Sequence, residues 1–232
     1  LQPGFQIVIN LKNKKSFSKK KWWRTIDHRV EVQKKYNDQV EEFKELFFNA
    51  CKLRLRSDVP IAASLSGGVD SSAVCSTIEQ IKKYADTERI STDKNLNVFF
   101  CEFSDDKFSE KKFAEDLVNN KNINFNYINL DKSSFSVEEL NQLQFDNEWI
   151  DPDKIQLSAM YKKMREKGFR VSLDGNTADE LFGGYWEDPI VAMMDEVRIF
   201  GKNSKRFFDL IEIRKNIGAS NTSEYKLRIR KL

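Results

Sequence analysis

Two short polar segments carry the residue types that could do chemistry in this chain. Residues 64–72 read S-L-S-G-G-V-D-S-S, and residues 173–185 read L-D-G-N-T-A-D-E-L-F-G-G-Y. A glycine turn before a helix presents backbone N–H groups to an anion, and serine hydroxyls add further donors. Asp70 would place a negative carboxylate beside bound phosphate, an arrangement that is explained if Asp70 holds Mg²⁺. The first segment therefore predicts a phosphate-binding turn with a magnesium ligand.

The elements that must position these segments follow from the apolar pattern. Strands are expected at residues 60–65, 97–103, 125–130 and 169–173, and helices at residues 70–83, 109–120, 136–144 and 154–167. Short apolar strands that alternate with helices favour an α/β fold, with a parallel sheet covered by helices on both faces. Ligands of such sheets bind at the carboxyl ends of the strands, where both polar segments lie. The two segments are therefore expected to converge on one site.

The remaining chain is divided by composition. A short strand is expected at residues 5–10, a long amphipathic helix at 30–56, a surface loop at 84–96 and mostly helical structure at 189–215. The domain prediction is a linker or arm at 1–29, an α/β domain at 30–188 and an incomplete helical extension at 189–232. The missing initial Met favours a partial chain.

Composition narrows the class of protein. Hydrophobic residues make up 40% and charged residues 32% of the 232 residues, as in a globular domain. No apolar run approaches the length of a membrane span, and no leader peptide is visible, so a cytoplasmic protein without a membrane partner is expected. Three scattered cysteines indicate reduced thiols. The single histidine argues against a histidine-rich metal site or a Ser-His-Asp triad.

The net charge of +3 is unevenly distributed, with basic stretches at residues 12–24 and 226–231. Such stretches form either a nucleic-acid footprint or a solvated surface. The solvated surface is the favoured interpretation, because charge runs are commonly solvated.

Both segments carry a family resemblance. Residues 66–72 resemble the S-G-G-x-D-S-S loop of the N-type ATP pyrophosphatases, and no Lys follows the glycines as in a Walker A loop. Residues 174–185 resemble the D-E-L-F-G-G-Y signature of the asparagine synthetase family. Residues 1–5 resemble the stretch that joins the glutaminase and synthetase halves of these enzymes. Residues 97–103, 109–114 and 146–152 resemble further family segments, so that most of residues 1–190 is covered.

The resemblance implies a Rossmann-like fold of the adenine nucleotide alpha hydrolase type and an ATP-dependent ligase. In the family a carboxylate attacks the α-phosphate of ATP, Mg²⁺-pyrophosphate leaves, and ammonia displaces AMP to give an amide. The substrate would be aspartate or a related acid. The residues that would bind ATP are Leu65, Ser66, Gly67, Gly68, Asp70, Ser71, Ser72, Cys101, Asp174 and Gly175. Asp70 and Asp179 would bind Mg²⁺, and Asn176 would lie near the reacting centre.

Three departures from the family pattern bear on the chemistry. Asn176 stands where an acidic residue is common, and an amide cannot act as a base, so either the substrate or amine step differs or Asn176 serves orientation only. No cysteine nucleophile of a glutaminase domain is present, so ammonia must come from a missing domain, a partner or solution. The family's late lysine lies beyond residue 232, which indicates a fragment or an impaired protein. A homodimer is an open prediction.

Two other functions are consistent with the sequence. A tRNA-modifying ATP pyrophosphatase is supported by the basic stretches and opposed by the D-E-L-F-G-G-Y signature and by the lack of paired cysteines. A degenerate nucleotide-binding module without catalysis is supported by Asn176 and by the missing lysine.

Overall fold

The computed structural model describes nine stretches of the chain: residues 1–13, 16–84, 95–104, 109–119, 121–131, 135–148, 152–185, 188–201 and 205–216. They fall in two compact units, residues 1–49 and 50–232, and the boundary lies inside helix α1 (Tyr36–Arg54). Within the described residues, no helix combines the length and the apolar character that a membrane crossing requires.

The first unit contains a two-stranded antiparallel hairpin of β1 (Phe5–Ile9) and β2 (Phe17–Lys21). The expected strand at 5–10 is confirmed, whereas β2 lies in a stretch that was expected to be an arm or loop. A 3₁₀ turn, η1 (Thr25–His28), follows, and the Trp23 ring stacks on His28 with 4.0 Å between ring centroids.

Helix α1 begins six residues later than expected. Residues 30–35 have no helical structure, and the side chains of Val30 and Val32 are 79% and 70% exposed. These two side chains bury little apolar surface that could stabilise another turn, and tertiary packing supplies most helical stability.

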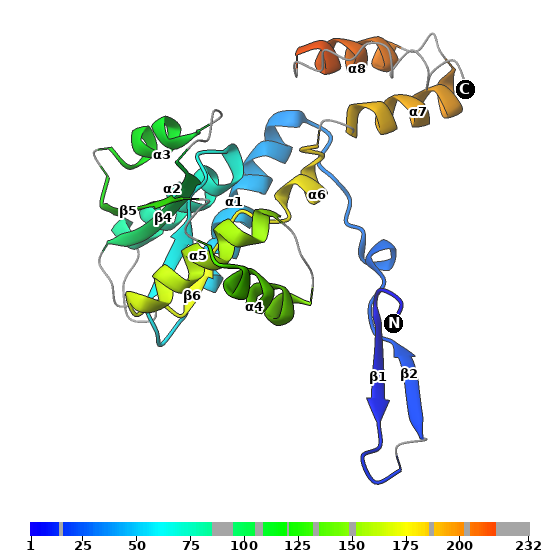
Figure 1. Ribbon diagram of the computed structural model, residues 1–232. Helices are drawn as coiled ribbons and strands as arrows, with labels where there is room; N and C mark the ends of the chain where they lie inside the picture. Colours follow the sequence, from blue (N-terminus) through cyan, green and yellow to red (C-terminus); the bar gives the residue numbers. More distant parts are fainter. Residues whose placement is uncertain are drawn as a thin grey trace. The chain divides into compact units, whose positions relative to one another are not determined.

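The second unit is built on a parallel sheet with the strand order β5-β4-β3-β6 (Figure 1). The strands are β3 (Ile61–Ser64), β4 (Leu96–Phe103), β5 (Ile123–Leu130) and β6 (Val171–Leu173). Ala62 of the central strand pairs with Asn97 on one side and with Ser172 on the other. The expected α/β class with a parallel, Rossmann-like sheet is confirmed.

Helices cover both faces of this sheet. They are α2 (Val69–Tyr84), α3 (Lys111–Val118), α4 (Val137–Asn147) and α5 (Pro152–Glu166). Buried Ala62 and Phe99 pack with Met160 of α5 on one face. Phe100 points to the opposite face, because side chains alternate along a strand, and its ring stacks with Tyr127 beneath α3. Figure 1 shows α3 and α5 on opposite sides of the sheet.

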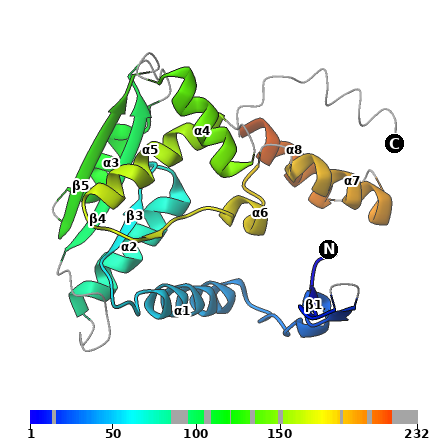
Figure 2. The same ribbon diagram turned by 60° about the horizontal axis from the view of Figure 1, so that its bottom comes forward.

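The second polar segment contains the short helix α6 (Ala178–Phe182). The chain after it is helical, as expected, and forms α7 (Asp188–Phe200) and α8 (Lys205–Asn216). Helices α7 and α8 lie side by side and bury Ile190, Met193 and Phe207 between them (Figure 2). Gly201, with φ of +82°, follows the end of α7. Residues 217–232 and most of the expected loop at 84–96 lie outside the described residues.

Candidate functional site

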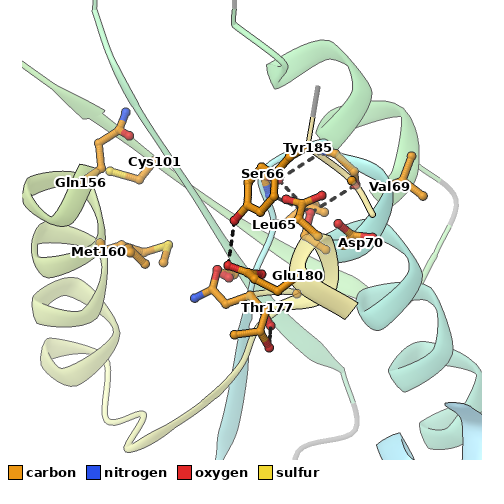
Figure 3. A pocket seen from close by; sticks show the side chains of 18 residues that line it. Leu65, Ser66, Val69, Asp70, Cys101, Gln156, Met160, Thr177, Glu180 and Tyr185 are labelled. Carbon is orange, nitrogen blue, oxygen red and sulfur yellow. Dashed lines mark hydrogen bonds between the residues drawn. The ribbon is translucent and has the colours of Figure 1, made fainter. Parts of the chain in front are cut away.

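The two polar segments meet because their strands are neighbours. Strands β3 and β6 pair in parallel, with Ala63 opposite Leu173, so the segments that follow them leave the same edge of the sheet. Together they line an open cleft of about 1020 Å³ (Figure 3). We call the segment at residues 64–72 the first loop and the segment at 174–185 the second loop.

Hydrogen bonds among its own serines shape the first loop. The Ser66 N–H donates to the Ser71 hydroxyl at 3.1 Å, and the Gly68 N–H donates to the Ser66 hydroxyl at 3.2 Å. The two hydroxyls lie 2.9 Å apart. Helix α2, of 16 residues, begins at Val69, so its positive end faces the cleft. The loop is therefore ordered before any anion binds.

A close backbone approach joins the two loops. A Cβ on Gly175 would lie 2.7 Å from the Ser71 backbone nitrogen and 2.9 Å from the Asp70 carbonyl carbon. Real Cβ atoms essentially never approach other heavy atoms this closely. Only glycine therefore lets the second loop rest directly on the first.

The Asp174 side chain fastens the same junction from outside the cleft. Its Oδ1 accepts hydrogen bonds from the Ser64 N–H at 3.1 Å and from the Ser172 hydroxyl, and its Oδ2 accepts one from the Tyr161 hydroxyl at 2.5 Å. Burial and then this hydrogen bond raise the pKa of Tyr161, which keeps the phenol protonated as a donor. Asp174 thus ties together β3, β6 and α5.

Three carboxylates line the cleft, and the described lining residues include no basic side chain. Asp70 belongs to the first loop, and Asp179 and Glu180 belong to α6 in the second. The Tyr185 hydroxyl donates to Glu180 at 2.7 Å and lowers the pKa of that carboxyl group, which keeps it ionised. Like charges repel, so these carboxylates disfavour a bare phosphate group and favour one that carries a cation.

The donor set fits Mg²⁺ shared with phosphate. Among the described residues, no cluster of three or more His, Cys, Asp or Glu side chains forms a metal cage. Mg²⁺ typically takes one or two protein carboxylates and completes its shell with phosphate oxygens and water. Asp70 and Asp179, one from each loop, match that requirement.

The opposite side of the cleft is more apolar. Figure 3 shows Gln156, Met160 and Cys101 on one side and Asp70, Glu180 and Tyr185 on the other. Burial raises the pKa of Cys101 to about 11, so its thiol stays neutral at ordinary pH. This side can accept the face of a purine base.

Most of the predicted site residues line this cleft: Leu65, Ser66, Gly68, Asp70, Ser71, Cys101, Gly175, Asn176 and Asp179. Three do not. Gly67 packs against Glu110, Ser72 donates its N–H to the Gly68 carbonyl, and Asp174 lies at the junction just described.

Sequence reasoning missed several lining residues, namely Gln156, Leu157, Met160, Thr177, Glu180 and Tyr185. Gln156 and Met160 are one helical turn apart on α5. The expected packing of that helix on the sheet could have indicated that both line the cleft. Thr177 gave no signal; its φ of +71° is rare for a β-branched residue.

The fold defines an α/β protein with a parallel, Rossmann-like sheet of the adenine nucleotide alpha hydrolase type, and its two loops share one cleft. The family model for asparagine synthase matches residues 42–227, and the chain belongs to that family.

Three relatives illustrate the extent of the match. Asparagine synthetase [glutamine-hydrolyzing] 1 of Bacillus subtilis is 31% identical over 159 residues, which is 66% of this chain and 23% of that protein. Putative asparagine synthetase [glutamine-hydrolyzing] 2 of Methanocaldococcus jannaschii is 28% identical over 204 residues, which is 85% of this chain and 36% of that protein. Amidase chyE of Penicillium rubens is 26% identical over 152 residues, which is 63% of this chain and 22% of that protein. The matched part is between about a fifth and a third of each relative.

Proposed function

We propose that the cleft binds ATP with Mg²⁺ and adenylates a carboxylic acid, the first step of an ATP-dependent amide synthesis. The contact of Gly175 with Asp70 and Ser71 is the observation that carries this proposal. It brings an anion-binding turn and a second carboxylate-bearing loop into one cleft. Membership of the asparagine synthase family supports the same reaction class.

Each side of the cleft has a part in this reaction. The first loop and the start of α2 direct N–H groups at the phosphates, while Leu65, Cys101 and Met160 provide an apolar wall for the adenosine. Asp70 and Asp179 would hold Mg²⁺. When bound, the metal neutralises phosphate charge and makes pyrophosphate a better leaving group.

The proposed reaction has two steps, adenylation of the carboxylate and formation of the amide. A carboxylate oxygen bonds to the α-phosphorus while the bond from that phosphorus to the bridging oxygen breaks and pyrophosphate leaves. Ammonia then attacks the acyl carbon, AMP leaves with the electron pair of the broken acyl–oxygen bond, and the nitrogen gives up one proton to solvent. Asn176 lines the cleft with an amide that donates and accepts hydrogen bonds but takes up no proton. We therefore assign it to orientation of the acyl group.

The names of the relatives support a substrate class and a partner for this proposal. Two of them are named as glutamine-hydrolysing asparagine synthetases, so we propose aspartate or a related acid as the acceptor. The same names support ammonia that is delivered by a glutamine-hydrolysing unit outside residues 1–232. Three free cysteines fit a reducing compartment such as the cytoplasm. A homodimer remains a prediction.

The test is pyrophosphate release from ATP and Mg²⁺ with aspartate and a panel of other carboxylates. Release should require a carboxylate and fall by about 10²-fold or more in Asp70→Asn, because one charge-stabilising group is lost. The matched control is Asp116→Asn, at an exposed position of α3.

Two other results would redirect the assignment. ATP binding without pyrophosphate release would favour the nucleotide-binding module. A tRNA mobility shift that weakens with salt would favour the tRNA-modifying enzyme.

A further inference from the structure

A buried glutamate lies next to the cleft and takes no part in the chemistry above. Glu102, near the end of β4, is 8% exposed and directly follows Cys101. Its Oε1 accepts a hydrogen bond from the Tyr127 hydroxyl at 2.8 Å, and its Oε2 accepts one from the Ser109 hydroxyl. A buried carboxylate is expensive unless it is hydrogen-bonded, so these two donors fix its position.

Tyr127 anchors this carboxylate to the sheet. Strands β4 and β5 pair with Phe100 opposite Tyr127, and the two rings stack at 6.2 Å between centroids. The Lys111 ammonium lies 3.9 Å from the centroid of the Tyr127 ring. The hydrogen bond to Glu102 raises the pKa of Tyr127, so the phenol remains a donor. Glu102 is therefore held rigidly on the sheet side.

On its other side Glu102 holds the start of α3. Ser109, which donates to Glu102, also accepts the Lys111 N–H at 3.3 Å. The next residue, Glu110, is the N-cap, and its carbonyl accepts the Phe113 N–H at 2.9 Å. The Glu102–Ser109 bond thus sets where this helix begins.

The start of α3 in turn supports the back of the first loop. A Cβ on Gly67 would lie 2.6 Å from the Glu110 carbonyl oxygen and 2.8 Å from the Glu110 Cβ. With φ of +93° as well, Gly67 is a position where only glycine allows the contact. Any shift of Glu110 is therefore transmitted to the Gly67–Gly68 turn.

We infer that Glu102 is a positioning residue for the phosphate-binding turn. It holds Ser109, Ser109 places Glu110 against Gly67, and that contact sets the direction in which the turn presents its N–H groups. Glu102 touches no reacting atom. The inference rests on the proposed binding of ATP in the cleft.

The test compares Mg²⁺-ATP with adenosine, which has no phosphates and so makes no use of the turn. Dissociation constants are measured by calorimetry for the chain and for Glu102→Ala, Glu102→Gln and Ser109→Ala. Both alanine variants should bind ATP roughly 2-fold to 30-fold more weakly and bind adenosine unchanged. Glu102→Gln keeps one acceptor oxygen and should recover part of the loss.

Ser109 is an exposed residue, so Ser109→Ala tests the inference even if Glu102→Ala fails to fold. The matched control is Glu196→Ala, at a carboxylate that is also 8% exposed but lies on α7, and its affinity for ATP should be unchanged.

Equal losses for ATP and adenosine, or unchanged ATP affinity in Ser109→Ala, would overturn the inference and leave the proposed function intact. Failure of the unmodified chain to bind ATP would remove both.

Discussion

Gly175→Ala is the substitution that most directly perturbs the junction of the two loops. The new Cβ would lie 2.7 Å from the Ser71 nitrogen, whereas ordinary contact begins at 3.4 Å, so the loops must separate by about 0.7 Å. The two nearest atoms, the Ser71 nitrogen and the Asp70 carbonyl carbon, belong to the backbone of the first loop. Rotation of a side chain cannot move them away. Overpacking of this kind costs about 1–3 kcal/mol of stability. A misplacement approaching 1 Å costs roughly 10²-fold in catalysis.

The assay pairs urea unfolding with pyrophosphate release. Gly168→Ala is the control, because Gly168 has φ of +90° but no heavy atom within 4 Å of a Cβ. That variant should lose roughly 1 kcal/mol to left-handed backbone strain and keep its activity. Full pyrophosphate release in Gly175→Ala would refute the argument that loop contact assembles the site.

Two further substitutions test other parts of the account. Thr177→Gly should stabilise the chain by about 0.5–1 kcal/mol in urea unfolding, because it relieves a φ of +71°. The control is Thr77→Gly, inside α2, which should destabilise the chain by a similar amount. A loss of stability in both variants would contradict the proposed backbone strain at Thr177. Burial raises the pKa of Cys75 from 9.0 to about 12. Because the folded state holds this proton more tightly, the stabilisation is complete below pH 9 and falls as the pH rises toward 12, by at most about 1.4 kcal/mol per pH unit. Cys75→Ala should flatten that decline in unfolding measured from pH 8 to 11, and equal slopes in both proteins would show that Cys75 does not titrate as described.

The sequence predicted the sheet and the loops because both are local patterns. Apolar runs bounded by glycine and polar residues marked the four parallel strands. The bounds of α2 to α5 agree with the structure to within about three residues, whereas α1 begins six residues later than expected. Strand β2 was missed because Ser-Lys-Lys-Lys carries no burial signal, and its side chains are exposed. Its backbone pairing with β1 alone makes it a strand.

The features of the site that escaped prediction depend on contacts between distant residues. Asp174 was expected among the ATP-binding residues, and no sequence pattern indicated that its carboxylate accepts a hydrogen bond from the Ser64 N–H, 110 residues away. Glu102 and Tyr127 are neighbours only through the register of β4 and β5. No periodicity or motif encodes such a pair, because the pair exists only once the strands are aligned.

Transfer of ¹⁸O tests the central claim most directly. The carboxylate that supports pyrophosphate release is labelled with ¹⁸O, and the AMP formed with Mg²⁺-ATP and ammonia is analysed by mass spectrometry. Adenylation predicts one ¹⁸O in AMP, because the acyl–oxygen bond breaks when the amine attacks. AMP without the label, formed while the amide accumulates, would contradict the proposal that this cleft activates a carboxylate by adenylation.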